Sequence, residues 1–261
     1  MTNTPAHLKR TGELHLAVKT SSDVISQYVH SLPLDLTEKQ SLEVYCKCGG
    51  NLYFDNAKSS QHFVLIAGGI GITPLSSIFK FHAESCPHAF VSLLYSVHRD
   101  EREFALLDEL AVCQVANSTR SSIVCTVSSH SVCKMEETCV YVYIYAHTYT
   151  HTHKNGLFLV TKSQSEKTQE QDEKKEESNK DVEKQRKTVD SDVMKKYWGG
   201  RTGRIDIDLI KKAVECQVRQ FELKSCQFVI CGPPSMLQTL PPLIVQHLNI
   251  SEKQIHFEKW W

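Results

Sequence analysis

Two short glycine-containing turns hold the residue types whose spacing could do chemistry in this sequence. In the first, residues 63–74, an apolar run leads into Gly68, Gly69 and Gly71, and then into Thr73 and Pro74. Glycines let a backbone turn sharply and approach a ligand closely, Thr73 can cap a helix, and Pro74 suits the first helical position. Backbone N–H groups at such a helix start favour an anionic pyrophosphate. The alternative is a glycine-rich turn that binds nothing.

The second turn, residues 229–236, repeats this order of an apolar strand, a glycine and a helix that starts near proline. It holds Cys231, Gly232, Pro233, Pro234 and Met236. By itself it could be a plain strand end followed by a helix. In a doubly wound sheet, however, ligands bind beyond the carboxyl ends of the strands, at the point where the strand order reverses. If the two strands are neighbours, one ligand can contact both turns.

Strands and helices alternate along the part of the chain that carries both turns. We predict strands at 62–67, 89–96, 122–127, 227–231 and 254–258, and helices at 74–83, 103–112, 206–218 and 235–248. Several of the strands are continuous apolar runs, as expected of strands that are buried on both faces. The alternation predicts an α/β fold with a doubly wound parallel sheet.

Composition and charge narrow the functional classes. The chain has 261 residues, 41% hydrophobic and 23% charged, which fits one large or two small globular domains. Its 30 basic and 30 acidic residues cancel, so nothing suggests electrostatic capture of nucleic acid or of an anionic membrane. No apolar run reaches the length of a membrane-spanning helix. We therefore expect neither a nucleic-acid partner nor membrane insertion.

The ten cysteines do not predict a metal site. None forms a C-x-x-C pair, which zinc ribbons and thioredoxin-type sites need, and the spacing of plant-type iron–sulfur ligands is absent. Cys46 and Cys48 fit the alternating side chains of a strand better than a metal hook. Free thiols, in a chain with no visible signal peptide, favour a reducing compartment.

Two regions differ from the α/β pattern. Residues 14–55 are β-rich but too short for a closed barrel, so we interpret residues 1–57 as the end of an antiparallel β-barrel domain and residues 58–261 as a second domain. Residues 163–190 are almost entirely polar and charged, which predicts a solvated, disordered loop. We therefore expect a disordered insertion at about residues 128–195, with residues 128–190 dispensable.

Residues 139–153, CVYVYIYAHTYTHTH, are explained best by their codons. Cys, Tyr and His alternate with Val, Ile, Ala and Thr, and a run of TG, TA and CA dinucleotide repeats would encode this order. We interpret the segment as a translated microsatellite, from a retained intron or a faulty gene model. A non-functional translation product is therefore one hypothesis. Weak metal binding by His147, His151 and His153 is the alternative interpretation of the segment.

Together, these motifs resemble ferredoxin–NADP reductases and cytochrome b5 reductases. The likeness rests on the A-G-G-x-G-x-T-P turn, the L-L-Y-S strand end, C-G-P-P-x-M and the terminal F-E-K-W-W, and it covers about residues 10–127 and 197–261. The resemblance implies a five-stranded sheet in the order 3-2-1-4-5, preceded by a remnant of a flavin-type barrel. It also implies an NAD(P)H-dependent oxidoreductase that passes hydride between a nicotinamide dinucleotide and FAD, with an unknown electron acceptor.

The resemblance assigns roles to individual residues. Gly68 to Thr73 would face the dinucleotide phosphates, Cys231 would sit beside the nicotinamide, and Trp261 would cover the flavin ring. Ser96 and Arg99 follow the second strand, where the family reads the adenosine ribose. Arg99 could pair with a 2′-phosphate or be a surface arginine, so NAD and NADP both stay open. The expected nucleotide-binding residues are Gly68, Gly69, Ile70, Gly71, Ile72, Thr73, Pro74, Ser96, Arg99, Cys231, Gly232, Pro233, Pro234 and Met236.

One part of the family pattern is not found. These reductases hold flavin with an R-x-Y-S/T strand in the preceding barrel, and no such motif precedes Leu14. We therefore expect an N-terminally truncated barrel and a chain that purifies without tightly bound flavin. A nucleotide-binding module without turnover is then the alternative function. The resemblance suggests a mitochondrial location, and a cytoplasmic one is the alternative because no targeting segment is visible.

Overall fold

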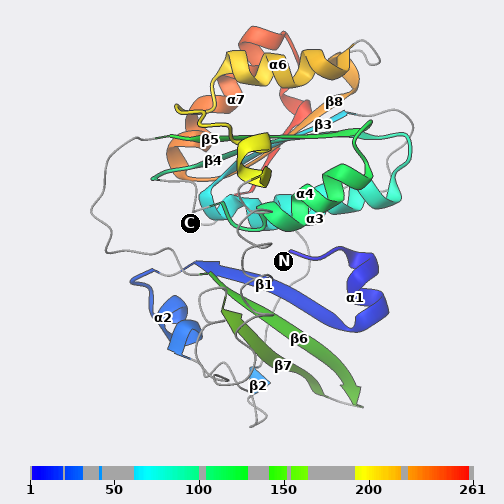
Figure 1. The fold of residues 1–261 in the computed structure, drawn as a ribbon, viewed down its shortest axis with the longest axis vertical. Helices are drawn as coiled ribbons and strands as arrows, with labels where there is room; N and C mark the ends of the chain where they lie inside the picture. Colours follow the sequence, from blue (N-terminus) through cyan, green and yellow to red (C-terminus); the bar gives the residue numbers. More distant parts are fainter. Residues whose placement is uncertain are drawn as a thin grey trace, which may run out of the picture.

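Both glycine turns follow strands of the larger of two sheets (Figure 1). The computed structural model describes residues 2–19, 21–31, 41–42, 62–99, 104–128, 141–151, 154–163, 192–218 and 223–258. The sheet consists of β3 (His62–Gly68), β4 (Phe90–Val97), β5 (Ser121–Val127), β8 (Cys226–Cys231) and β9 (Ile255–Phe257). Their order is β5-β4-β3-β8-β9, and every neighbouring pair is parallel. Counted within this sheet, the order is 3-2-1-4-5, so the expected topology is confirmed.

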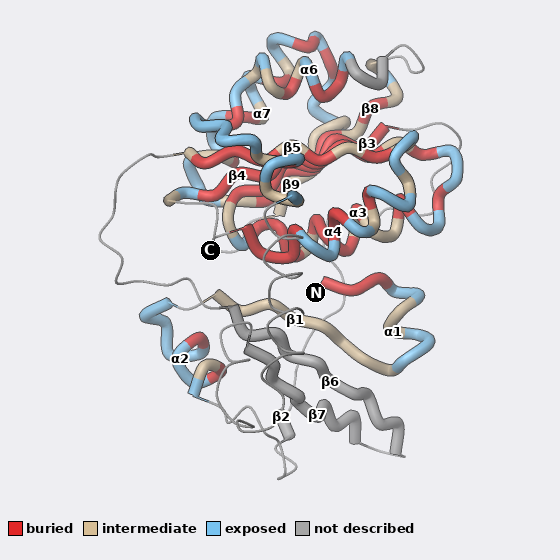
Figure 2. Tube along the Cα trace, in the orientation of Figure 1, coloured by how far each residue is buried: buried red, intermediate tan, exposed pale blue. Residues whose placement is uncertain are grey.

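Helices cover both faces of this sheet, which is why its strands are mostly apolar. The helices α3 (Ile72–Ser85) and α4 (Leu107–Ala116) lie on one face, and α6 (Ile207–Val218) and α7 (Pro234–Leu248) on the other (Figure 1). Phe63 and Leu65 pack into the cluster with α3 and α4, whereas Val64 and Ile66 pack into the cluster with α6 and α7. Buried residues therefore concentrate along the strands in the middle layer (Figure 2). The α/β fold class is confirmed.

The register of the parallel strands brings the two turns to one edge. Ala67, near the end of β3, pairs with Cys231 at the end of β8, and Gly68 pairs with Ser96 in β4. The residues that follow these positions therefore leave the sheet side by side, at its carboxyl edge. This is the arrangement in which one ligand can reach several strand ends.

The smaller sheet is antiparallel and contains residues that we expected to be disordered. Its order is β1-β6-β7-β2, and its members are β1 (Glu13–Lys19), β2 (Ser41–Leu42), β6 (Tyr141–His151) and β7 (Lys154–Ser163). Two short helices, α1 (Pro5–Thr11) and α2 (Val24–Ser31), flank β1. Every residue of β1 pairs with a residue of β6.

The strands β6 and β7 correct part of the expected insertion at 128–195. The β6 sequence alternates tyrosines with valine, isoleucine, alanine and threonine, and aromatic and β-branched residues favour strands. The edge of β1 offers the backbone partners that such a strand needs. The rest of that insertion up to residue 191, namely 129–140, 152–153 and 164–191, lies outside the described residues, as do residues 43–55 of the stretch predicted to be β-rich. The expected domain division at 57/58 stays a prediction.

One predicted helix begins later than expected. We predicted a helix over 103–112, but α4 begins at Leu107 because residues 104–106 form a turn, in which Leu106 has a left-handed φ of 63°. The buried hydroxyl of Tyr95 accepts the N–H of Ala105 at 3.1 Å, which holds this turn on the sheet.

None of the described helices combines the length and the hydropathy needed to span a membrane.

Two buried histidines, His62 in β3 and His82 in α3, stay neutral at ordinary pH. The Nε2 atom of His62 lies 2.9 Å from the Ser92 hydroxyl, and the ring of His82 stacks on Phe63 with centroids 3.9 Å apart. Burial lowers the pKa of His62 to about 4 and the pKa of His82 to about 4. In both cases desolvation of the charged imidazolium is the cause.

These two pKa values predict a loss of stability in mild acid. The folded pKa lies below the unfolded value of 6.5, so the unfolded chain binds protons first as the pH falls. The free energy of unfolding should therefore be unaffected above pH 6.5 and fall between pH 6.5 and 4, by up to about 1.4 kcal/mol per pH unit for each histidine. Urea unfolding of the parent chain and of His82→Phe, at several pH values, measures this slope. The control is His88→Gln, which replaces an exposed histidine. If the unfolding free energy of His82→Phe fell as steeply with decreasing pH as that of His88→Gln, the assignment would be contradicted.

Candidate functional site

The first glycine turn is a single 3-10 turn, η1 (Gly69–Gly71), between β3 and α3. Gly69 has a φ of +53°, which residues with a side chain rarely adopt. Gly71 is required for a different reason: a Cβ atom there would overlap the backbone carbonyl of Cys231. The turn after β3 therefore packs directly on the backbone at the end of β8.

The second turn closes this contact from the other side. A Cβ atom at Gly68 would lie 2.7 Å from Cδ of Pro233, and one at Gly232 would lie 3.2 Å from the Cα of Gly68. The chain then enters α7 at Pro234. The two turns that the sequence singled out are thus in van der Waals contact, as expected if they serve one ligand.

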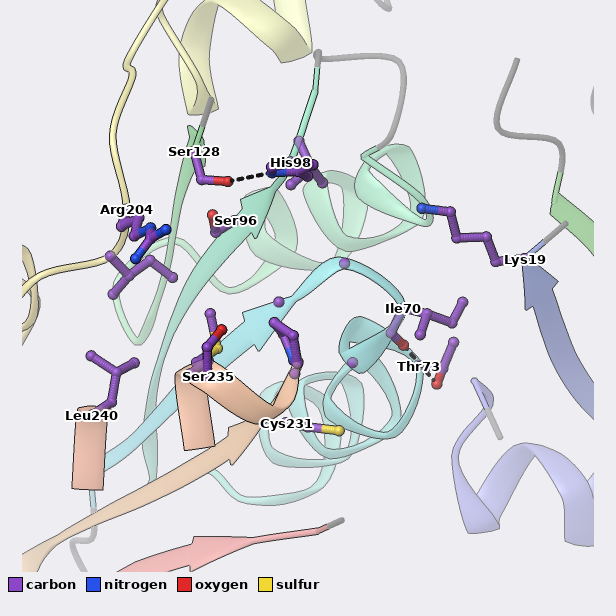
Figure 3. A pocket seen from close by; sticks show the side chains of 18 of the residues that line it. Lys19, Ile70, Thr73, Ser96, His98, Ser128, Arg204, Cys231, Ser235 and Leu240 are labelled. Atoms are coloured by element: carbon purple, nitrogen blue, oxygen red, sulfur yellow. Dashed lines mark hydrogen bonds between the residues drawn. The ribbon is translucent and has the colours of Figure 1, made fainter. Parts of the chain in front are cut away.

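A cavity of about 650 Å³ opens above the two turns (Figure 3). This volume falls in the range of small-molecule and cofactor sites. The turns after β3 and β8 form its floor, and the ends of β4 and β5 contribute Ser96, His98 and Ser128. Lys19 of β1 reaches it from the smaller sheet, so the cavity is shared between the two sheets.

The charges around the cavity fit an anion. Lys19 and Arg204 lie at opposite sides of it in Figure 3, and none of the described residues that line it is acidic. The cap residue of α3, Gly71, and its second residue, Thr73, both line the cavity, so the positive end of the helix dipole faces the same space. An elongated ligand with negative charge between its ends would meet favourable electrostatics throughout.

Most of the expected nucleotide-binding residues line this cavity. They are Gly68, Gly69, Ile70, Gly71, Thr73, Ser96, Cys231, Gly232, Pro233 and Met236. Four others do not line it: Ile72, the first residue of α3, is buried in the core, and Pro74, Pro234 and Arg99 are not among the lining residues. Trp261, expected to cover a flavin ring, lies outside the described residues.

The expected role of Thr73 as a helix cap is wrong. The helix α3 begins at Ile72, and its cap position is Gly71, which has no side chain to offer. The Thr73 hydroxyl instead donates to the carbonyl of Ile70 at 3.0 Å (Figure 3). Pro74 lies in the first turn of the helix, where its missing N–H breaks no intrahelical bond. The Thr73 hydroxyl therefore stabilises the 3-10 turn that precedes the helix and does not cap the helix.

Several cavity residues were missed in the sequence. His98 and Ser128 directly follow β4 and β5, and their side chains are 3.4 Å apart; the rule that ligands bind at carboxyl edges would have found both. Arg204 follows Arg201–Gly203, a segment that bonds back to the end of β5: the N–H of Gly203 donates to the carbonyl of Val127 at 2.8 Å. Lys19 carries no local signal, because only the packing of the two sheets brings it here.

Cys231 is the one ionisable side chain at the junction of the two turns. It is buried, with 2% of its surface exposed, and it lines the cavity. A soft sulfur at this position can contact a flat ring without competing for its hydrogen bonds. Its surroundings suit positioning rather than proton transfer.

Comparison with known proteins gives the family context. The family described as "Ferric reductase NAD binding domain" matches residues 60–244. A protein of Pongo abelii named "Oxidoreductase NAD-binding domain-containing protein 1" is 26% identical over 261 residues, which is 99% of this chain and 63% of that protein. A Danio rerio protein of the same name is 36% identical over 89 residues, 33% of this chain and 31% of its own length. The chain thus spans less than two thirds of these relatives.

Solved structures with some likeness were also found. The "Flavohem-like-FAD/NAD Binding Domain" of a Vibrio cholerae nitric oxide dioxygenase has a TM-score of 0.48 and 14% identity, covering 92% of this chain and 68% of that one. The cytochrome b5 reductase domain of Ulva prolifera nitrate reductase has a TM-score of 0.43 and 16% identity, covering 77% of this chain and 51% of that one.

The contact between the two turns predicts a strong difference between neighbouring glycines. Gly71→Ala should lower the free energy of unfolding by about 1–3 kcal/mol, the cost of overpacking, because the turns must separate. Gly69→Asn should cost less than about 1 kcal/mol, because its added Cβ meets open space and Asn tolerates a left-handed φ. Urea unfolding of both variants tests this. Equal losses would contradict the backbone contact.

Proposed function

Because the chain belongs to the family of ferric reductase NAD binding domains, we propose that it binds NAD(H) or NADP(H) and serves an NAD(P)H-dependent oxidoreductase reaction. The observation that carries the proposal is the convergence of the Gly68–Gly71 and Cys231–Pro233 turns at one sheet edge, under a single cavity. A glycine turn that leads into a helix start is suited to a pyrophosphate. The neighbouring turn then has room for a second part of the same ligand.

Each part of the dinucleotide has a matching part of the cavity. The pyrophosphate would lie against Gly69 and Ile70, at the positive end of α3. The nicotinamide would lie beside Cys231, whose sulfur would hold the ring in place for hydride transfer. The adenosine end would extend towards Ser96 and Arg204, at the ends of β4 and of the segment that returns to β5.

The choice between NAD and NADP depends on which arginine meets the adenosine ribose. Arg99 follows β4 but does not line the cavity, whereas Arg204 does. A 2′-phosphate next to Arg204 would form a charge-assisted hydrogen bond. We therefore propose that Arg204, rather than Arg99, sets any preference for NADP(H).

We propose a flavin as hydride acceptor, because the motifs resemble flavin-dependent reductases; a flavin takes two electrons and accepts hydride from reduced nicotinamide. It would approach from the side that β1 closes, since Ala17 and Lys19 form that wall of the cavity. The chain's own task there is to hold the nicotinamide flat between Cys231 and this wall, and to keep water away from it.

A second candidate function is a nucleotide-binding module without turnover. The observation in its favour is that no arginine of this sequence begins an R-x-Y-S/T pattern. Under this hypothesis the cavity, its charges and its nucleotide affinity are unchanged. Only the transfer of hydride differs, and an experiment on transfer separates the two.

Nucleotide binding can be tested together with the choice of arginine. NADH and NADPH are titrated into the protein, and nicotinamide fluorescence reports the bound fraction. Arg204→Gln should weaken NADPH about 10- to 100-fold, the value of one hydrogen bond between charged groups, and NADH far less. The matched variant Arg99→Gln should leave the affinities for both nucleotides within about threefold of the parent. A threefold change corresponds to about 0.6 kcal/mol of binding free energy. A larger effect at Arg99 would reverse the assignment, and a parent chain that binds neither nucleotide would refute the proposed function.

Hydride transfer can be tested with added flavin. Without oxygen, saturating NADH and excess FAD are mixed with the protein, and the loss of flavin absorbance is followed. Cys231→Ala should slow this loss on the order of 10²-fold, with little change in NADH affinity, because it removes a positioning contact. An unchanged rate would leave Cys231 with packing alone. No catalysed bleaching by a parent chain that binds NADH would favour the module without turnover.

A further inference from the structure

A second group of chemically capable side chains lies far from the nucleotide cavity. His7 on α1 faces Glu13 and His15 at the start of β1, whereas Lys19, at the end of the same strand, lines the cavity. Four residues of extended strand separate His15 from Lys19 by about 13 Å. The group therefore belongs to no site described so far.

The three side chains converge on one point. The Nε2 atom of His15 lies 3.2 Å from Oε2 of Glu13, and the Nε2 atom of His7 lies 3.6 Å from the same oxygen. The three potential ligand atoms all lie within 4.8 Å of one another. An ion bound at about 2.1 Å to each of three tetrahedral ligands needs separations of about 3.4 Å. The two separations from the Glu13 oxygen, 3.2 Å and 3.6 Å, are already close to that value.

His7 gives an independent indication. Its Nε2 atom is buried and has no hydrogen-bond partner among the described residues, and 3.6 Å to Glu13 is too long for a hydrogen bond. Such an atom carries a desolvation cost that a bound cation would remove. Arg10 reaches the other ring nitrogen at 3.5 Å. A metal that binds Nε2 of His7 displaces the proton there to Nδ1. Because Arg10 is exposed, its side chain can then turn away from Nδ1.

The backbone under the cluster is fixed before any ion binds. The Asn3 side chain donates to the carbonyl of Glu13 at 2.7 Å and accepts the N–H of His15 at 3.1 Å. The Thr4 hydroxyl caps α1 by accepting the N–H of His7 at 3.2 Å. Ser77 of α3 in turn donates to the carbonyl of Asn3 at 2.8 Å. The ligand-bearing strand and helix are therefore held together by their own hydrogen bonds.

We propose that His7, Glu13 and His15 bind a borderline divalent cation, for which Zn²⁺ is the representative ion. Two imidazoles and one carboxylate suit this class, whereas Mg²⁺ and Ca²⁺ prefer oxygen ligands alone. The three side chains keep 20–29% of their surface exposed, which leaves room for a water molecule as fourth ligand. The bound ion joins α1 to β1 and so stabilises the edge of the smaller sheet.

The test is a titration of the whole 261-residue chain after treatment with EDTA. His151 and His153 are first replaced by Gln, so that these two histidines do not compete for the ion. Calorimetry with ZnCl₂ should then give one site per chain, and ZnCl₂ should raise the melting temperature, whereas MgCl₂ should not. In this background, His7→Gln, Glu13→Gln and His15→Gln should each weaken Zn²⁺ at least tenfold. His88→Gln, at an exposed solitary histidine, should bind Zn²⁺ as the parent does.

His7→Gln decides the question if a change in β1 impairs folding, because His7 lies on the helix and not in the sheet. Its melting temperature without metal verifies that it is folded. Tenfold or greater weakening in folded His7→Gln supports the site. No saturable binding at one equivalent in the parent, Zn²⁺ affinity in His7→Gln within twofold of the parent, or equal stabilisation by Mg²⁺ would each overturn it.

Discussion

The backbone contact between Gly71 and the carbonyl of Cys231 is the constraint on which the nucleotide cavity depends. It is possible only because no Cβ stands at residue 71, and it brings the turn after β3 against the turn after β8. Both strands are centrally placed and parallel, so their carboxyl ends already lie at one edge. Because residue 71 has no Cβ, the two turns touch and form a continuous floor. A Cβ at this position would hold the two turns apart and leave a gap between them.

Two separate apolar clusters hold β3 at the place where this contact forms. Alternate residues of the strand pack towards α3 and α4, or towards α6 and α7. Some polar groups inside bond to one another: His62 bonds to Ser92, whose hydroxyl also accepts from Ser122 at 3.0 Å. Burying such groups without partners would be costly. The rigidity of the floor therefore comes from layers of packing on both faces, and the ligand-facing residues need little support of their own.

The parts that could be predicted from the sequence are those with a local signal. Apolar runs, glycines and prolines at 62–74 and 226–236 are local, and they predicted the two turns, whereas the strand order came from the resemblance to the reductase family. Lys19 and Arg204 could not be predicted, because each reaches the cavity through contacts between segments distant in sequence. The cap at Thr73 failed because a 3-10 turn intervened, and one extra half-turn moves a capping residue into the helix. The repeat-like run at 141–151 has a codon-level explanation, yet its residues also favour strands, and composition alone could not choose between these.

The return of the chain to the end of β5 has a consequence for how this domain tolerates added residues. Val127 N–H donates to the carbonyl of Arg201, Gly203 N–H donates to the carbonyl of Val127, and the Thr126 hydroxyl donates to the carbonyl of Gly203. These bonds join the two ends of the long excursion between β5 and α6 at a single point. Since the entropy of closing a loop grows only with the logarithm of its length, doubling such an excursion costs about 0.6 kcal/mol. Residues added at this point therefore cost the nucleotide domain little stability, provided that β6 keeps its pairing with β1.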